Sequence, residues 1–528
     1  MAHPSSFAND FLQRLASRPA ADHDLPTFDF LNASDRDLIV TNSTPETFHL
    51  GTGASIFTRC LLPAIASAQH EVILVTCFWA RSKTLTSLSD ALTKLAIHRQ
   101  QLIQDTTARG SPSIPPLNIR ICLSSRSLFQ KLLHPQSRDG FIYPPSSWEA
   151  ELGLPDPSVL EAGGIHLRIK SLFFLPFSVM HPKFVIIDRQ KAFVPSCNVS
   201  WEPWLEGCVE LSGGAVGGLF EFYSRTWEIP SEAHTLLVPR HDTAGDGRAS
   251  NTREANLPLV RSTADQSIAL DSPMPLPTFI LGSSHHQNPR FRPFPWQNSA
   301  APPGTPLNVA LFQLFEKAQQ RIYVQTPNLT CEPVLAALLD ALTRGVDVTI
   351  VTSRNMMVME QLITAGTTTG WKLRSFIRRY QRLRADDGGK GGLGASNTAD
   401  VDLEAGLVGR RPGGTANTRI GRLRVSYFRA KQPQALDNGS PQGGRRQELG
   451  GDEEVEEPVH SHLKLTIVDG EYAVLGSGNL DRASFFTSQE LGIMFQDREF
   501  CATVKSGVDE VLNGRLALVF ESDDARND

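Results

Sequence analysis

Two stretches of this chain repeat one pattern, and that pattern decides the fold. The first reads His181-Pro182-Lys183-Phe184-Val185-Ile186-Ile187-Asp188, and the second reads His462-Leu463-Lys464-Leu465-Thr466-Ile467-Val468-Asp469. A short apolar run rich in β-branched residues predicts a buried strand. Histidine and lysine two residues apart on an extended chain point to the same face, so an imidazole and an ammonium group can converge on one anion.

Each stretch continues into a predicted β-hairpin. Turn sequences follow, Asp188-Arg189-Gln190 in the first copy and Asp469-Gly470-Glu471 in the second. The return strands end in Ser196-Cys197-Asn198 and Ser477-Gly478-Asn479, with 17 residues from histidine to asparagine in both copies. A pattern that recurs with the same spacing in one chain is a strong signal of a shared structural unit.

The hairpin register predicts which side chains meet. A turn centred between residues 189 and 190 places Asn198 opposite His181 and Ser196 opposite Lys183. A turn centred between residues 470 and 471 gives the second copy the same arrangement. The sequence therefore predicts one cluster of His, Lys, Ser and Asn in each half of the chain.

Acidic residues accompany this pattern at two places. Seven residues of extended chain span about 23 Å, so Asp188 and Asp469 are expected at the far turn, in a structural role. A Glu-Leu pair follows each asparagine, with Glu210 12 residues after Asn198 and Glu490 11 residues after Asn479.

A longer repeat surrounds the motif. Residues 68–76 match residues 318–326, and a helical segment follows each at the same offset. A further strand is predicted at 119–123 and at 346–351. Strands that alternate with helices predict an α/β fold made of two pseudo-symmetric α-β-α sandwich halves, each with a central mixed β-sheet.

Composition divides the chain and limits its location. Forty per cent of the residues are hydrophobic, the net charge is −5, and seven scattered cysteines form no CxxC pair. These features predict reduced thiols, an intracellular protein that is cytoplasmic or peripheral to a membrane, and no signal peptide or transmembrane helix. The predicted parts are an N-terminal extension at 1–46, a first half at 47–230, a linker at 231–275, and a second half at 276–520 with disordered insertions near 386–418 and 432–458.

The duplicated H-x-K-x4-D motif with its downstream Ser-x-Asn resembles the phospholipase D superfamily. The segment from Gly476 to Ser484 is especially similar to the cardiolipin synthase-like branch, and the resemblance covers roughly residues 50–225 and 300–515. It implies the phospholipase D/nuclease fold, one active site at the interface of the halves, and a covalent phosphohistidine formed without a cofactor or metal. Pro195 departs from the glycine that the family usually has before the serine.

The resemblance also implies a role for each residue of the motif. By family analogy, His181 is the nucleophile and His462 is the general acid. Glu210 and Glu490 are expected to orient the imidazoles by accepting hydrogen bonds from ring N–H groups. The lysines and asparagines are expected to stabilise the negative charge of the phosphoryl oxygens, with the two serines in support: Lys183, Lys464, Asn198, Asn479, Ser196 and Ser477.

Three functions stay open on the sequence alone. The leading one is a monomeric phosphodiesterase that hydrolyses phospholipid or transfers phosphatidyl groups; the others are a nuclease of the same superfamily and a non-catalytic phosphate-binding scaffold. The acidic net charge counts against nucleic acid without excluding it. Residues 371–384 read either as a basic amphipathic helix for peripheral membrane contact or as an ordinary surface helix. Residues 172–177 read either as an apolar lip or as a buried strand and turn.

Overall fold

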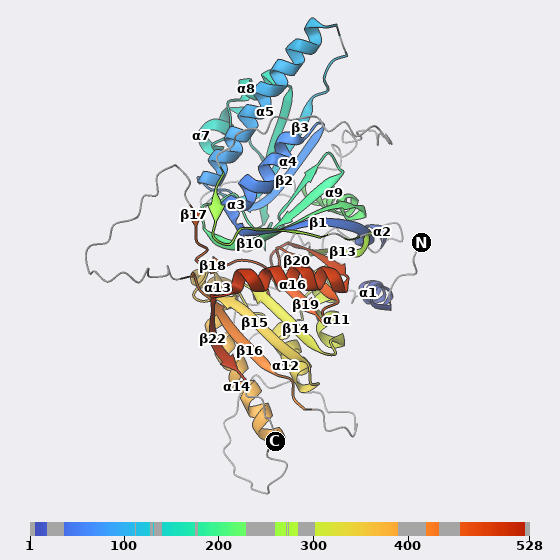
Figure 1. Cartoon of the computed structure of the whole chain (residues 1–528), viewed down its shortest axis with the longest axis vertical. Helices are drawn as coiled ribbons and strands as arrows, with labels where there is room; N and C mark the ends of the chain where they lie inside the picture. The colour runs from blue at the N-terminus through green and yellow to red at the C-terminus, as the bar shows by residue number, and fades with distance from the viewer. Residues whose placement is uncertain are drawn as a thin grey trace, which may run out of the picture.

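The structure is a computed structural model that shows two α/β halves stacked along the long axis of the molecule (Figure 1). It describes residues 6–17, 36–110, 112–126, 130, 140–174, 178–228, 259–270, 272, 274–283, 301–388, 419–431 and 455–522. The predicted insertions at 386–418 and 432–458 fall largely outside these described residues.

The first half is built on a mixed sheet in the order β1-β10-β9-β8-β2-β3-β5-β4. The β2–β3 and β3–β5 pairs are parallel and the others are antiparallel. The bounds are β1 (Val40–Thr52), β2 (Glu71–Phe78), β3 (Leu117–Ser125), β4 (Phe141–Ile142), β5 (Ile165–Ser171), β8 (Phe184–Ile187), β9 (Lys191–Pro195) and β10 (Trp204–Gly213). Because β1 begins at Val40, the first half starts earlier than the predicted residue 47.

The second half repeats this order as β13-β21-β20-β19-β14-β15-β16-β22. Its parallel pairs, β14–β15 and β15–β16, occupy the same places as those of the first half. The bounds are β13 (Leu276–Ser283), β14 (Arg321–Thr326), β15 (Asp347–Ser353), β16 (Leu423–Phe428), β19 (Leu465–Val468), β20 (Tyr472–Gly476), β21 (Glu490–Gln496) and β22 (Leu516–Glu521). The predicted pair of mixed sheets is confirmed.

The two sheets join edge to edge, because β1 pairs antiparallel with β13. One hydrophobic core runs through this junction, from Phe48 on β1 to Phe279 on β13 and into both halves. A second core lies in the first half alone, under α5. Since the larger core is shared, neither half encloses all of its own apolar surface.

Helices cover both faces of the joined sheets (Figure 1). The helices of the first half are α2 (Arg36–Ile39), α3 (Gly53–Ile56), α4 (Leu62–Ser67), α5 (Lys83–Ala108), α7 (Trp148–Leu152), α8 (Pro157–Ala162) and α9 (Gly214–Trp227). Those of the second half are α11 (Pro306–Lys317), α12 (Glu332–Thr343), α13 (Val358–Ala365), α14 (Thr369–Gly388), α15 (Arg482–Phe486) and α16 (Arg498–Leu512). In the described part of the chain, no helix is both long enough and apolar enough to cross a membrane.

The N-terminal helix α1 (Ser6–Ala16) packs on the second half. Its buried Phe7 and Phe11 rings both meet Phe279 edge-on, with ring centroids 5.8 Å apart. The Gln313 amide on α11 donates to the Phe7 carbonyl at 3.1 Å. The predicted N-terminal extension therefore contains a helix that contributes to the shared core.

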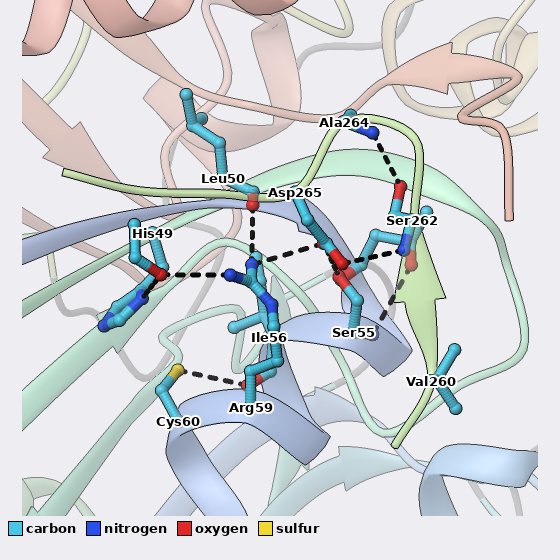
Figure 2. Close-up of polar contacts among 12 residues, drawn as sticks. His49, Leu50, Ser55, Ile56, Arg59, Cys60, Val260, Ser262, Ala264 and Asp265 are labelled. Carbon is cyan, nitrogen blue, oxygen red and sulfur yellow. Dashed lines mark hydrogen bonds and ion pairs between the residues drawn. The ribbon is translucent and has the colours of Figure 1, made fainter. Parts of the chain in front are cut away.

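The described part of the predicted linker is held against the first half (Figure 2). It contains β11 (Arg261–Ser262) and β12 (Gln266–Ala269), and β12 pairs with β1. The Arg59 guanidinium donates to the Leu50 carbonyl at 2.7 Å and lies 3.2 Å from the Asp265 carboxylate. Asp265 also accepts from the Ser55 hydroxyl at 2.6 Å. These bonds fix residues 259–270 as an extra strand of the fold.

The motif hairpins form with a register one residue from the predicted one. Ile187 pairs with Lys191, and Val468 pairs with Tyr472, so each turn has three residues and not an even number. Asp188 and Asp469 both adopt positive φ, at 51° and 53°. Aspartate tolerates this left-handed conformation better than most residues, which accounts for the tight turn.

Each motif aspartate ties its hairpin to a neighbouring strand of the sheet. The Asp469 carboxylate accepts three backbone N–H groups, from Gln319, Gln320 and Arg321 at the start of β14, at 2.8–2.9 Å. Asp188 accepts the equivalent three groups at the start of β2, at 2.7–2.9 Å. Both carboxylates lie at the end of the hairpin opposite to the histidines.

We expect Asp469→Ala to destabilise the fold without changing the chemistry. Three charge-assisted hydrogen bonds are lost, so the free energy of unfolding should fall by about 2 kcal/mol or more. Denaturant unfolding measures this loss, and turnover per folded molecule should stay within about twofold. Asp188→Ala is the matched variant in the first half. A large fall in turnover with unchanged unfolding would instead place the carboxylate in the chemistry.

Candidate active site

Each motif histidine is held against a strand of the opposite half. Met180 forms a parallel bridge with Gln489, and the His181 N–H donates to the Gln489 carbonyl at 2.9 Å. In the second copy, β18 (His460–Ser461) pairs parallel with β10, and the His462 N–H donates to the Leu205 carbonyl at 2.8 Å. Gln489 and Leu205 each precede a glutamate, so each histidine is brought beside the glutamate of the other half.

The imidazoles and carboxylates form two crossed pairs. His181 Nδ1 lies 2.8 Å from Glu490 Oε2, and His462 Nδ1 lies 2.8 Å from Glu206 Oε1. The side chains of Glu490, Glu206 and His462 are all at most 4% exposed, whereas that of His181 is 13% exposed. Because Nδ1 is occupied in both rings, Nε2 is the atom that each histidine presents to a substrate.

The serines of the motif support the carboxylates directly. The Ser477 hydroxyl donates to Glu490 at 2.5 Å, and the Ser196 hydroxyl donates to Glu206. Glu490 has one further donor, the Ser484 hydroxyl on α15, at 2.7 Å from Oε1. The two carboxylates are therefore not equivalent, since Glu490 accepts from two hydroxyl groups and Glu206 from one.

Glu210 does not orient a motif imidazole, and Glu206 takes the place expected for it. The Glu210 carboxylate lies 2.6 Å from Lys191 Nζ and 3.6 Å from His49 Nε2, on the part of β10 that runs beside β9 toward the hairpin turn. The prediction treated Glu210 and Glu490 as equivalent because a leucine follows each of them in the sequence. The sheet instead pairs Ser196 with Gly207 and Ser477 with Leu491 through their backbone groups.

This pairing identifies the equivalent glutamates. Glu206 and Glu490 each precede the residue that faces the motif serine. Glu206 follows Asn198 by eight residues, whereas Glu490 follows Asn479 by eleven, because α15 lies only in the longer second connection. Counting back along the ladder from each serine would have found Glu206 in the sequence.

The lysines and asparagines complete the site. Lys183 Nζ and Lys464 Nζ each donate to the carbonyl of the histidine two residues before, at 2.8 and 2.7 Å. The Phe78 N–H donates to Asn198 Oδ1 at 3.2 Å, which leaves the N–H donors of that amide for a phosphate oxygen. Asn479 Nδ2 donates to Asp481 at 3.1 Å. Both lysine ammonium groups lie near enough to both imidazoles to lower the pKa of each histidine.

Burial and mutual repulsion control the charges of the site. Burial, helped by the positive Lys464 and Lys183, lowers the pKa of His462 well below its ordinary value. Burial also lowers the pKa of His181, although the neighbouring Glu490 opposes this shift. Burial lowers the pKa of Lys464 to about 7.

The two carboxylates shift in opposite directions. Burial raises the pKa of Glu206 to about 7, although Lys464 and Ser196 oppose it. Burial alone would also raise the pKa of Glu490, but His181, Ser477 and Lys183 lower it overall. At neutral pH Glu490 is therefore ionised, whereas Glu206 is close to half protonated.

Other predicted features lie outside this cluster. Cys197 is buried, and burial raises the pKa of its thiol well above the ordinary value, so it is no nucleophile. Leu172 and Phe173 are also buried, which favours the strand-and-turn reading over the apolar lip; residues 175–177 lie outside the described residues. Residues 371–384 are helical within α14, with Leu373, Phe376 and Tyr380 buried in the core.

Comparison with known proteins agrees with this geometry. Residues 311–511 match the family model described as cardiolipin synthase, PLD-like domain. By this match, residues 311–511 resemble a phospholipase D-like domain. The first half carries the same motif and strand order, and the two halves together form the candidate active site. No curated protein matches the chain.

The chain shares its fold with a solved structure at low sequence identity. Phosphatidylserine synthase from Haemophilus influenzae Rd KW20 matches with a TM-score of 0.50 and 13% identity over 97% of this chain and 92% of that one. Nuc, a phospholipase D family member from Salmonella typhimurium, matches with a TM-score of 0.24 and 12% identity over 40% of this chain and 90% of that one. At these identities the likeness is one of fold.

The phospholipase D-like site should bind anions less well as the pH rises through 7. Lys464 loses its positive charge there and Glu206 gains a negative one, so both changes make the site more negative. Sulfate keeps its charge over this range, and its inhibition constant should rise above pH 7 by up to about tenfold per pH unit for each of the two titrating groups.

The measurement is sulfate inhibition of a chromogenic phosphodiester assay between about pH 6 and about pH 8. Glu206→Gln should flatten the dependence, because one of the two titrating groups is removed. Glu210→Gln, on the same strand but outside the site, is the matched control. An inhibition constant that does not change with pH would contradict the assigned charges.

Proposed function

We propose that this protein is a phosphodiesterase that acts on phospholipids, by hydrolysis or phosphatidyl transfer, through a covalent phosphohistidine. The crossed pairs His181–Glu490 and His462–Glu206 carry the proposal. They hold both imidazoles through Nδ1, beside the motif lysines and asparagines. This is what in-line attack on a phosphodiester and protonation of its leaving group require.

Three observations support a phospholipid as the substrate. The matching family model is described as cardiolipin synthase, PLD-like domain, and the fold neighbour that aligns over 97% of the chain is a phosphatidylserine synthase. The net charge of −5 gives no general attraction for nucleic acid. A nuclease, which would use the same chemistry, is the alternative.

In the first step His181 is the nucleophile. Its Nδ1–H donates to the ionised Glu490, which leaves the Nε2 lone pair directed at phosphorus. The new bond is N–P, and the bond that breaks joins phosphorus to the oxygen of the leaving alcohol. The non-bridging oxygens are held by Lys183 and Lys464 during this exchange.

His462 protonates that leaving oxygen from Nε2. The partly protonated Glu206 can pass its proton to Nδ1 as Nε2–H is given up, so the pair delivers one proton without holding a buried imidazolium. In the second step Nε2 of His462 takes a proton from water or an alcohol, which attacks phosphorus and releases His181. The opposite pKa shifts of the two carboxylates thus support opposite roles for the two histidines.

This division of roles predicts a dependence on the leaving group. Glu206→Gln can hold the His462 ring but cannot pass it a proton. It should slow cleavage of an alkyl phosphodiester by about 100-fold, and that of a p-nitrophenyl diester much less, because nitrophenolate leaves without protonation. Glu490→Gln should slow both substrates, since it weakens the nucleophile. Equal losses for both substrates with Glu206→Gln would contradict the proton transfer.

Substrate class is tested by comparing lipid and DNA directly. We expect the protein to consume phosphatidylglycerol or phosphatidylcholine, to form a new diester when a primary alcohol is added, and to leave single-stranded DNA intact. His181→Ala and His462→Ala should both abolish the activity. Cleavage of DNA with lipids untouched would favour the nuclease.

The non-catalytic scaffold makes a distinct prediction in the same assay. It requires no turnover of any diester and no phosphoenzyme after acid quenching with a 32P-labelled substrate. Both copies of the motif keep their His, Lys, Ser and Asn, and each has its carboxylate, which argues against loss of activity.

A further inference from the structure

Large apolar side chains are exposed at one corner of the second half. Met359 and Ile363 lie four residues apart on α13 and are 70% and 57% exposed. Trp371, near the start of α14, is 56% exposed. We call these three residues the α13–α14 corner. Clustered exposed apolar groups beside a site usually mark an interaction surface.

This corner lies at the rim of the candidate active site. β15 ends at Ser353, whose hydroxyl donates to the Ser461 carbonyl at 2.8 Å and accepts the Ser461 N–H at 2.9 Å. Ser461 directly precedes His462, and α13 begins five residues after Ser353. On its other side α13 packs on α15, which follows Asn479. In Figure 1, α13 lies at the level where the two halves meet.

The turn that presents α13 has an unusual backbone. Asn355 and Met357 adopt positive φ, at 55° and 50°. Methionine rarely adopts this left-handed conformation, and such strain is concentrated at functional sites. The exposed Met359 and Ile363 are therefore held outward by a turn that costs stability, which is unexpected for an ordinary surface helix.

A stripe of arginines runs along α14 from this corner. Arg374, Arg378 and Arg382 are four residues apart and all exposed, on the side opposite the buried Leu373, Phe376 and Tyr380. We call these three arginines the arginine stripe. Like charges at this spacing destabilise a helix unless an anionic partner meets them.

Two other cations of the helix are neutralised within the protein. Lys372 and Arg379 both contact the Glu332 carboxylate, at 3.0 and 2.5 Å. The arginine stripe is thus the part of α14 whose charge is available to a partner, and it continues from the exposed apolar corner.

We propose that the α13–α14 corner and the arginine stripe dock this protein on an anionic phospholipid bilayer. The arginines meet the negative headgroups, and Met359, Ile363 and Trp371 enter the interface beside the site. This inference rests on the proposed phospholipid substrate. It differs from insertion of α14 itself, because the apolar face of that helix is buried in the core. A nucleic acid would be attracted by the arginines but would gain little from exposed methionine and isoleucine.

The test measures binding of the full-length protein to vesicles by cosedimentation. Vesicles of phosphatidylcholine alone are compared with vesicles that contain about one third phosphatidylglycerol. One variant is Met359→Ser/Ile363→Ser, and the other is Arg374→Gln/Arg378→Gln/Arg382→Gln. Ile97→Ser/Leu102→Ser is the matched control, because these exposed side chains, at 46% and 42%, lie on α5 in the other half.

We expect the wild-type protein and the control to bind the anionic vesicles alone. Each corner or stripe variant should bind at least tenfold more weakly, and the arginine variant about 100-fold. All of them should keep wild-type turnover of a soluble chromogenic diester. Wild-type protein that binds no vesicles, or variants that bind as the wild type does, overturn the proposal.

Two further outcomes separate the docking surface from the proposed function. Vesicle binding that depends on the corner, without turnover of any lipid, leaves the surface standing and removes the phospholipid substrate. Lipid turnover in mixed micelles, together with vesicle binding that is unchanged in the variants, supports the phospholipid substrate and removes the docking surface. Retention of single-stranded DNA that is lost only in the arginine variant, without vesicle binding, identifies a nucleic-acid surface and overturns the docking proposal.

Discussion

The structure depends on two buried carboxylates, one from each half. Glu206 of the first half and Glu490 of the second each pair with an imidazole of the opposite half. An unpaired buried carboxylate costs several kcal/mol, and Glu206 and Glu490 avoid this cost through an imidazole of the opposite half. The parallel contacts Met180–Gln489 and Ser461–Leu205 set the spacing of both pairs. Separation of the halves would take the imidazole away from both carboxylates and open the shared core, so the fold and the site have a common interface.

The repeat in the sequence was enough to predict the two sheets and the motif cluster, because it fixes which side chains share a strand. It did not determine the register, since a three-residue turn and a four-residue turn have similar sequences but shift the pairing by one residue. Glu210 was chosen because a Glu-Leu pair occurs in both halves. In the sheet, the equivalent glutamates are instead the ones that precede the backbone partners of Ser196 and Ser477. A comparison of residue types does not take into account that the connection after Asn198 is shorter, whereas the hydrogen bonds of the sheet do.

That difference in length is also the source of asymmetry in a nearly symmetric site. The longer second connection forms α15, whose Ser484 adds a donor to Glu490. The shorter first connection ends at Trp204, whose ring lies 4.9 Å from the His462 ring at 43°, an apolar neighbour that adds no donor to Glu206. The pKa values of the two carboxylates also differ, because His181, Ser477 and Lys183 lower that of Glu490, whereas burial raises that of Glu206 to about 7. The proposed mechanism uses this difference to give opposite roles to two otherwise equal histidines.

The helix at 371–384 shows what sequence periodicity cannot decide. Its apolar and basic faces are both visible in the sequence, but the pattern is the same whether the apolar face meets lipid or protein. In the fold this face packs on the core, with Tyr380 against Phe520, so the apolar face of the helix is not available to a bilayer. The residues that could do so, Met359 and Ile363, belong to a helix that carries no basic stripe of its own. Only the tertiary structure brings their helix against the start of α14, where the Thr369 N–H donates to Gln361, and close to Ser461, which precedes His462.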